Sequence, residues 1–296
     1  MQKGNLDLVI KNRIEVIIID ALNLVHRYNW SMRNLKDSKG RDTGIFYGIL
    51  NFYCGLKMKY GEQVRIIFLW DRNSNKKKIS KEYKANRKTA EDSFIQKVKE
   101  LENLLSYLDV EQYYKEGMEA DDLAYYFAKQ YKERNVLFIS KDNDWLINII
   151  NDKKLIQIED KVYCKSEIEE SLGMDIKYYP LFKAIIGDAC DNIHGIFRAK
   201  QTENKKTIKE LISILEEIKG DLLFIDNLRF SNGTSLLKNF IIDNIDKIRE
   251  NYELVKFQEL NGEMNSIRRK KNKKEFFKKL ESYEMKHLIE KIKKYV

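Results

Sequence analysis

The chain has few of the residues that build disulfide-linked or zinc-bound folds. Its 296 residues include three cysteines, three histidines and one proline. The cysteines, at positions 54, 164 and 190, are odd in number and lack metal-type spacing. This argues against a disulfide framework or a zinc site and is typical of a reducing cytoplasm. The histidines are scattered along the sequence, so we expect neither a histidine-based metal site nor a catalytic triad.

Long apolar stretches are also absent from the sequence. The best one, Val16 to Ile19, ends at Asp20 and is far too short to cross a membrane, and the first residues lead into no apolar core of the signal-peptide kind. What is present is a globular composition, 43% apolar and 34% charged, with 55 basic against 46 acidic residues. We expect a cytoplasmic protein without a membrane partner, and the basic excess suggests a polyanionic one.

Short β-branched runs alternate with helix-like stretches in the first half of the chain. The runs are mostly apolar on consecutive positions, as in strands that are covered on both faces. The expected strands are 14–19, 64–70, 110–114, 136–140 and 155–158, and the expected helices between them are 44–59, 90–108 and 121–134. This alternation predicts an α/β fold with a doubly wound, mainly parallel sheet.

After about residue 166 the strand signal disappears and helical periods dominate, at 179–186, 204–218, 235–248 and 284–294. We therefore divide the chain into an α/β core, residues 1–165, and a helical region, residues 166–296. Two basic segments interrupt the pattern. The first, Arg72–Lys88, carries a single acid, Glu82, and the second, Arg268–Lys274, is expected to be a mobile linker or loop.

Acidic residues follow the predicted strands. They are Asp20 after the first strand, Asp71 after the second, Glu119, Asp121 and Asp122 after the third, and Asp142 and Asp144 after the fourth. If the strands are parallel, these groups meet at one edge of the sheet, where ligands bind in open α/β folds. Carboxylates gathered there repel one another unless a cation holds them together.

Oxygen ligands without histidine or cysteine suit Mg²⁺ or Mn²⁺ rather than zinc. Two such ions about 3.5–4 Å apart activate water and stabilise the leaving oxygen of a phosphodiester. Each acid taken alone is as readily explained as a helix cap or a turn residue. For the whole set the capping explanation is poor, so the sequence predicts a two-metal site.

A longer motif supports this interpretation. Residues 187–195, Gly-Asp-Ala-Cys-Asp-Asn-Ile-His-Gly, resemble the G-D-x-x-D-N-I-x-G signature of the 5′-nuclease family. That family includes flap endonucleases, phage 5′→3′ exonucleases and the 5′-nuclease domain of bacterial DNA polymerase I. Other matching elements occur in the family's order: Asp20 with Asn23-Leu24 and Arg27, Leu69-Trp70-Asp71, Tyr83-Lys84-Ala85-Asn86-Arg87, Glu119-Ala120-Asp121-Asp122 and Asp142-Asn143-Asp144. The resemblance covers about residues 14–195.

The resemblance implies a division of labour among the acids. Asp20, Asp71, Glu119 and Asp121, with Asp122 as a further candidate, would hold the first metal ion, and Asp142, Asp144, Asp188 and Asp191 would hold the second. Two Mg²⁺ ions are the expected cofactors, with Mn²⁺ as a substitute. Because every family acid has a counterpart in this chain, we expect an active enzyme.

The basic segment resembles the helical arch of the family, which we place at about residues 72–92. Lys84 and Arg87 lie three apart, so on a helix turn both would reach one phosphate and offset the charge of the transition state. We assign these two residues the catalytic role and expect Tyr83 to stack on a terminal base. Arg27 and Gly44 are assigned to DNA contact, although close helix packing is an equal alternative for Gly44.

Past Asp191 the family has a helix–two-turn–helix module that grips the duplex backbone, often with a bound K⁺. Gly195 is followed by no second glycine in this hairpin, so the sequence gives no support for a potassium site. Lys200, Lys205 and Lys206 are the expected phosphate contacts.

We therefore expect a sequence-independent 5′→3′ exonuclease or flap endonuclease of replication or repair. It would act as a monomer on DNA with 5′ flaps or free 5′ ends and on RNA–DNA hybrids, in a bacterial cell or a phage-infected host. Two alternatives remain. A PIN-type ribonuclease shares the acidic α/β site but lacks the arch and the Asp188–Asp191 motif. A structure-specific DNA-binding protein would bind the same substrates without catalysis.

Overall fold

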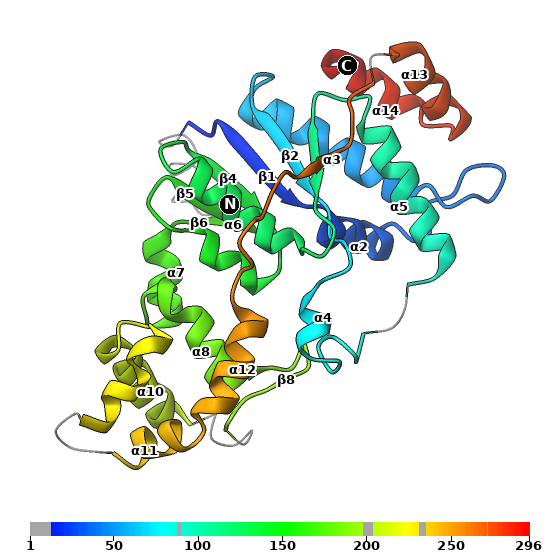
Figure 1. Cartoon of the computed structure of the whole chain (residues 1–296). Helices are drawn as coiled ribbons and strands as arrows, with labels where there is room; N and C mark the ends of the chain where they lie inside the picture. Colours follow the sequence, from blue (N-terminus) through cyan, green and yellow to red (C-terminus); the bar gives the residue numbers. More distant parts are fainter. Residues whose placement is uncertain (1–12, 88–89, 198–203, 231–234, 271) are drawn as a thin grey trace. The chain divides into compact units, whose positions relative to one another are not determined.

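The computed structural model describes residues 13–87, 90–197, 204–230, 235–270 and 272–296. The chain forms two units that are interleaved along the sequence. Unit 1 comprises Met1–Asn73, Thr89–Cys164 and Glu259–Val296, and unit 2 comprises Ser74–Lys88 and Lys165–Gln258. Each unit has its own internal packing (Figure 1).

Unit 1 is built around a seven-stranded sheet with the order β6-β5-β4-β1-β2-β3-β9. Its strands are β1 (Val16–Asp20), β2 (Arg65–Leu69), β3 (Glu111–Tyr114), β4 (Val136–Ile139), β5 (Lys154–Ile158), β6 (Lys161–Tyr163) and β9 (Asn265–Ser266). The strands β1 to β5 pair in parallel, whereas β6 and β9 form antiparallel edges. Asp20 pairs with Leu69, so β1 and β2 end at the same edge of the sheet.

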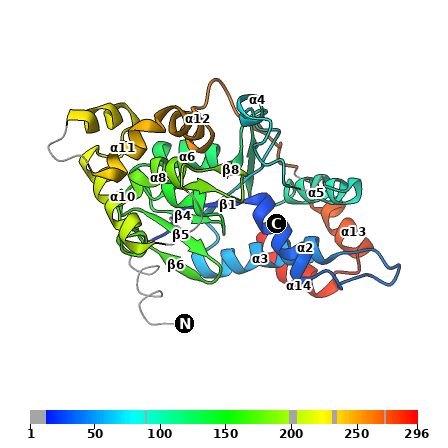
Figure 2. The ribbon, with the colours of Figure 1, turned by 90° about the horizontal axis from the view of Figure 1, so that it is seen from below.

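Helices cover both faces of this sheet. On one face Ile17 and Ile19 pack into a core with α2 (Ala21–Ser31), α3 (Gly44–Tyr60), α5 (Asp92–Leu105), α13 (Lys273–Ser282) and α14 (Lys286–Ile292), which is followed by the short 3-10 helix η4 (Lys293–Tyr295) (Figure 2). On the other face α6 (Ala120–Gln130) packs on β1 and β2, and Phe138 contacts Trp145 of the 3-10 helix η1 (Asn143–Asn148). The predicted doubly wound, mainly parallel sheet is confirmed.

The structure differs from the predicted domain boundary at its C-terminal side. The division at residue 165 placed all later residues in one helical region, but residues 259–296 belong to unit 1. Phe276, Leu280 and Leu288 are buried in the core that covers the sheet, and β9 pairs with β3. The helical period of this segment was visible in the sequence. The core that it joins was not, because amphipathic spacing gives the buried face of a helix and not its partner.

Unit 2 is mainly helical. Its elements are α4 (Lys76–Ile79), α7 (Lys165–Leu172), η2 (Ile176–Tyr178), α8 (Tyr179–Ile186), β7 (Gly187–Asp188), β8 (Ile193–His194), α10 (Lys205–Glu217), η3 (Leu222–Phe230), α11 (Leu236–Asp243) and α12 (Ile245–Val255). Residues 74–88 of the basic segment, which were predicted to be part of the α/β core, belong to this unit, and α4 contacts α12. In the ranges that the structure describes, no helix combines the length and the apolar character needed to cross a membrane.

A small antiparallel hairpin, β7–β8, carries the Gly-Asp-x-x-Asp motif of unit 2. Gly187 has a φ of 88°, and a Cβ at this position would lie 2.4 Å from the backbone nitrogen of Gly195, so the hairpin closes only around glycine. The buried amide of Asn251, from α12, donates to the carbonyl oxygens of Ala184 and His194 at 2.9 Å each. The same side chain therefore joins α8, which precedes the hairpin, to β8, its second strand.

Lys154, at the start of β5, holds the end of α6. Its side chain is buried, and Nζ donates to the carbonyl oxygens of Tyr131, Lys132 and Arg134 at 2.9, 3.1 and 3.0 Å. Burial, together with the charge of Lys153, lowers the pKa of Lys154 to about 8. We expect Lys154→Met, which keeps the chain length but removes the donors, to lower the free energy of unfolding by about 1–3 kcal/mol.

Urea unfolding of wild type and Lys154→Met measures this effect. Lys153→Met is the matched control, because Lys153 is exposed and its replacement should cost no more than about 0.5 kcal/mol. Equal losses of stability in the two variants would contradict the capping role of Lys154.

Candidate active site

Asp20 is the central acid of unit 1. It ends β1 and caps α2, where its Oδ1 accepts the backbone N–H of Asn23 at 3.0 Å. Its Oδ2 accepts the hydroxyl of Ser140 at 2.8 Å, and only 6% of the residue is exposed. The apolar run Val16–Ile19 forces this carboxylate to the end of a fully buried strand, so it lies at the carboxyl edge of the sheet.

A second group of acids lies where β2 ends and α6 begins. Asp71 Oδ1 accepts the backbone N–H of Ala120 at 2.9 Å, which joins the end of β2 to the start of α6. Glu119 and Asp122 form a reciprocal capping box, and the Asp122 carboxylate accepts the Glu119 N–H at 3.0 Å. Asp122 is fully buried, so its observed contact is that of a helix cap, and Asp121 presents the more accessible carboxylate.

The Asp142-Asn143-Asp144 motif follows β4 as predicted. Asp142 caps η1, with its Oδ1 accepting the backbone N–H of Asp144 at 2.9 Å. Ser140 links this motif to Asp20, because its Oγ accepts the Asp142 N–H at 3.0 Å and donates to Asp20. The structure thus brings together the acids that follow β1, β2, β3 and β4 at one edge of unit 1.

The electrostatics of Asp20 test whether this group fits a cation. Burial, followed by the charge of Asp71 and, more weakly, that of Asp142, raises the pKa of Asp20 to about 8, although hydrogen bonds from Asn23 and Ser140 act in the opposite direction. A buried carboxylate that is destabilised by neighbouring carboxylates is a ligand that a divalent cation would stabilise. The donors are all oxygens, so the residues fit a hard cation.

We expect metal binding to release a proton from Asp20. With a pKa of about 8 in the metal-free protein, Asp20 is mostly protonated at pH 7, whereas a metal ligand must be ionised. Titration calorimetry in two buffers of different ionisation enthalpy should show release of about one proton per bound ion at pH 7. Affinity for the ion should rise as the pH increases and level off above a pH of about 8. Asp20→Asn should bind metal without this proton release, and equal release in the variant would contradict the assignment.

Asp188 and Asp191, the remaining predicted ligands, belong to unit 2, and their part in a shared metal site stays a prediction. Asp188 forms an ion pair with Lys183 of α8, whose Nζ lies 2.5 Å from Oδ2 of Asp188. Burial alone would raise the pKa of Asp188, but Lys183 and two backbone N–H donors outweigh it and lower that pKa. Asp188 is therefore ionised at neutral pH and already faces a cation.

The basic segment surrounds the other acid of the motif. Arg87 reaches Oδ1 of Asp191 at 2.6 Å, and Lys84 Nζ lies 3.7 Å from Oδ2. The prediction that Lys84 and Arg87 share one helix turn is wrong, because the helix of this segment is only α4, residues 81–87 form turns and a bend, and Lys84 has a φ of 55°. The two cations nevertheless converge on one anion, which is the carboxylate of Asp191.

Tyr83 does not lie where it could stack on a base. It is 2% exposed and packs against Ile193 and Leu254, and its hydroxyl donates to Asp191 Oδ2 at 3.1 Å. The predicted stacking role is corrected for this reason: the ring is a core residue of unit 2. The resemblance of Tyr-Lys-x-Asn-Arg to the family's arch predicts a nucleic-acid contact, but a motif of five residues does not reveal whether its aromatic ring is buried.

The remaining predicted DNA contacts are scattered. Gly44 supports the packing alternative, since a Cβ there would lie 2.3 Å from the carbonyl oxygen of Met32. Arg27 lies 3.9 Å from the exposed Asp160, a weak surface pair. Lys205 and Lys206 are exposed at the start of α10, whereas Lys200 lies outside the described residues.

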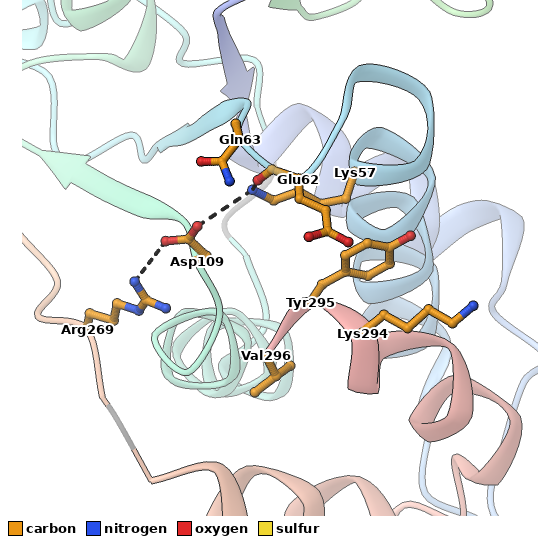
Figure 3. A pocket seen from close by; sticks show the side chains of 8 residues that line it. All are labelled: Lys57, Glu62, Gln63, Asp109, Arg269, Lys294, Tyr295 and Val296. Atoms are coloured by element: carbon orange, nitrogen blue, oxygen red, sulfur yellow. Dashed lines mark hydrogen bonds and ion pairs between the residues drawn. The ribbon is translucent and has the colours of Figure 1, made fainter.

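Unit 1 also contains a cavity of about 250 Å³, formed by residues that precede β2 and β3 together with Arg269 and the last three residues of the chain, 294–296 (Figure 3). Lys57 of α3 donates to the carbonyl oxygens of Glu62 and Val64 at 2.8 and 3.0 Å and lies 3.7 Å from Asp109. Arg269 pairs with the other oxygen of Asp109 at 2.8 Å. These charges satisfy one another and lie before the strands rather than after them. We assign the cavity a structural role, joining the C-terminal segment to the sheet.

Comparison with known families agrees with this site. The model of the family described as 5′-3′ exonuclease, N-terminal resolvase-like domain, matches residues 15–173. The chain belongs to this 5′-3′ exonuclease family. The matched residues include the carboxylates that follow β1 to β4, so the acid cluster of unit 1 lies inside the part that defines the family.

Relatives of this family member differ in length. A 5′-3′ exonuclease of Buchnera aphidicola is 31% identical over 194 residues, which are 63% of this chain and 67% of that protein. A 5′-3′ exonuclease of Aquifex aeolicus is 25% identical over 287 residues, 94% of either chain. DNA polymerase I of Borreliella burgdorferi is 30% identical over 218 residues, 69% of this chain but 24% of the polymerase. The chain thus spans about a quarter of the polymerase.

Solved structures show the same fold for this 5′-3′ exonuclease family member. The flap endonuclease of bacteriophage T5, crystallised as a complex with DNA and metal ions, superposes with a TM-score of 0.62 and 24% sequence identity. The match covers 81% of this chain and 88% of the phage protein.

Sequence reasoning missed two residues that touch the acids of this exonuclease family member. Ser140 ends the apolar run before the Asp-x-Asp motif and bonds Asp20. Its signal was available, because a hydroxyl at the end of a strand beside two acids is well placed to donate a hydrogen bond to one of them. Lys183, five positions before Asp188, forms an ion pair with it. Lys183 lies in a helix that is otherwise apolar, so the sequence alone suggests a solvent-facing lysine and not a partner of Asp188.

Proposed function

We propose that the protein is a structure-specific, metal-dependent 5′ nuclease that hydrolyses DNA phosphodiesters at 5′ flaps and free 5′ ends. The observation that carries this proposal is the gathering of carboxylates at the carboxyl edge of the unit 1 sheet around the buried Asp20. Membership in the 5′-3′ exonuclease family supports the reaction, and the phage relative crystallised with DNA and metal ions supports the substrate.

The side chains of unit 1 would hold the cation through Asp20, Asp71, Glu119 and Asp121, and Mg²⁺ is the ion that we propose. When bound, such an ion polarises a phosphoryl oxygen and lowers the pKa of a bound water. Ser140 and the backbone N–H of Ala120 fix the orientations of Asp20 and Asp71, so the carboxylates are arranged before a ligand arrives. Pre-arranged ligands add little reorganisation to the reaction.

The cations of unit 2 would act on the phosphate itself. Lys84 and Arg87 already bind one carboxylate together, which shows that their charged ends can meet on a single anion. A phosphate offers the same kind of oxygen acceptors, and a guanidinium binds it with directional hydrogen bonds. RNA–DNA hybrids and a monomeric state belong to the same proposal, as does a task in flap or primer removal.

Cleavage of a 5′-labelled flap substrate tests the proposal. We expect cuts at or near the junction with Mg²⁺ or Mn²⁺, and no cuts with EDTA. A fully paired duplex without a free 5′ arm and a linear single-stranded RNA are the matched substrates. Preferred cleavage of the RNA would favour the PIN-type ribonuclease, and tight flap binding without cleavage in any metal would show a binding protein instead.

A further inference from the structure

The carboxylate of Asp191 is enclosed by donors from the basic segment. Its Oδ1 accepts Arg87 at 2.6 Å, its Oδ2 accepts the Tyr83 hydroxyl at 3.1 Å, and Lys84 Nζ lies 3.7 Å from Oδ2. The side chain of Asp191 is 8% exposed, against 15% for Lys84 and 52% for Arg87. One buried anion thus occupies the point on which two cations and a hydroxyl converge.

Backbone contacts hold the two segments in this register. The Lys84 N–H donates to the carbonyl oxygen of Asp191 at 2.9 Å, next to the ion pairs. Asn86 donates to the carbonyl oxygen of Ala189 at 3.2 Å, and Asn192 donates back to the carbonyl oxygen of Glu82 at 2.8 Å. Residues 82–87 and the 189–192 loop are therefore bound to each other by side chains and backbone together, all within unit 2.

The donors around Asp191 are those that a phosphate would use. Charge-assisted bonds from guanidinium and ammonium groups are the strong contacts for either a carboxylate or a phosphate. A cation cannot give its full interaction to two separate anions, so binding of one anion weakens the hold on the other. Because Arg87 is half exposed while Asp191 is buried, an anion from solution can approach the arginine without first displacing the loop.

We propose that Asp191 is an internal competitor for the substrate phosphate. In the substrate-free protein it neutralises Lys84 and Arg87, and a phosphate of the DNA takes these cations over when it binds, which releases the Asp191 carboxylate. Tyr83 is a positioning residue in this exchange, because its hydroxyl holds Oδ2 and its buried ring fixes the hydroxyl. This inference rests on the proposed DNA substrate. It adds that the Asp191 carboxylate binds and neutralises the cations of the basic segment until the substrate binds.

The clamp is measured first in the protein without DNA, in EDTA. Hydrogen–deuterium exchange of the peptide that covers residues 80–87 reports how firmly the segment is held. Asp191→Asn should increase its exchange rate by about tenfold or more, and Tyr83→Phe, which keeps the ring in its cluster, should give a smaller increase. Asp188→Asn is the matched control, since it removes the same charge from the same motif but faces Lys183. Unchanged exchange in Asp191→Asn would overturn the proposal whatever the protein does to DNA.

The competition is measured next by binding of a 5′-flapped DNA in EDTA, where no cleavage occurs. Asp191→Asn should tighten binding by about tenfold, and this gain should disappear when Arg87→Gln is also present. Asp188→Asn should change the affinity equally with and without Arg87→Gln. If Asp191→Asn has the same effect in both backgrounds, only net charge has changed and the exchange is refuted. Tyr83→Phe should act in the same direction as Asp191→Asn, and weaker binding would refute the positioning role of its hydroxyl.

These outcomes are independent of the proposed function. Loss of cleavage in wild type would remove the nuclease activity but would leave the exchange and binding measurements unchanged. Conversely, an active nuclease with no coupling between Asp191 and Arg87 would retain its function and lose this inference.

Discussion

Asp20→Asn is expected to slow cleavage of a flap substrate by at least about 10³-fold, which corresponds to roughly 4 kcal/mol of transition-state stabilisation. Asparagine has the same shape as aspartate, and its remaining oxygen can still cap α2 by accepting the Asn23 N–H. What is removed is the charge that the buried Asp20 carboxylate would offer to a bound cation. The loss should therefore appear in the rate of the chemical step and not in folding.

Single-turnover cleavage with Mg²⁺, together with DNA affinity in EDTA, separates these effects. The affinity should stay within about threefold of wild type, because in the metal-free protein Asp20 is buried and mostly protonated and offers no donor cation to a phosphate. Asp152→Asn, an exposed aspartate in the turn before β5, is the control for loss of one charge from unit 1. If Asp20→Asn retained most of the rate, the acids that follow β1 to β4 would be helix caps and nothing more.

The fold was predictable where the local pattern and the tertiary environment agree. The five runs expected to be strands all form β1 to β5. In β1, β2 and β4 the apolar residues stand on consecutive positions and are buried, which only a place between two layers allows. The predicted helix 235–248 is two helices, α11 and α12, which meet at Asn244. A short turn between two amphipathic helices hardly disturbs the spacing of the apolar residues, so the sequence gives no sign that the helix ends and a second one begins.

Short strands at the sheet edges were not predicted. β9 is two residues long and pairs with β3 through Asn265 and Ser266, which are polar and exposed. The same C-terminal segment contacts α3 through α14, a contact between segments more than two hundred residues apart in the sequence. The hydrophobic periodicity of a sequence describes neighbouring residues and does not predict a contact between segments so far apart.

The site was predictable in its residue types and less so in its contacts. The acids after β1, β2, β3 and β4 were found from position alone, since parallel strands end at one edge. Tyr83 shows the limit of such reasoning. In the sequence it stands among cations and resembles a base-stacking residue, whereas in the structure its ring fills a small core and its hydroxyl holds Asp191.

Lys84→Ala is expected to lower the single-turnover cleavage rate by about 10²–10³-fold, the size of effect that follows the loss of one well-placed donor to a developing charge. Its effect on DNA affinity should be no more than about threefold. The reason for the difference is the contact with Asp191. Lys84 lies 3.7 Å from the Asp191 carboxylate and loses that contact when it binds the phosphate. The loss largely offsets the attraction of Lys84 to the phosphate of the bound substrate. In the transition state the phosphate carries more charge at the reacting oxygens, so the attraction of Lys84 to the phosphate exceeds the attraction to Asp191 that it has lost.

Rates at saturating enzyme and affinities in EDTA measure the two effects separately. Lys81→Ala is the matched control, because Lys81 is an exposed lysine three residues upstream in the same basic segment, and its loss should alter the rate by less than about threefold. Lys84→Arg should cleave faster than Lys84→Ala but more slowly than wild type. A guanidinium keeps the positive charge, but it is larger and planar, whereas an ammonium is a compact charge. A fall in affinity as large as the fall in rate would make Lys84 a simple binding residue, and the offset by Asp191 would then be absent.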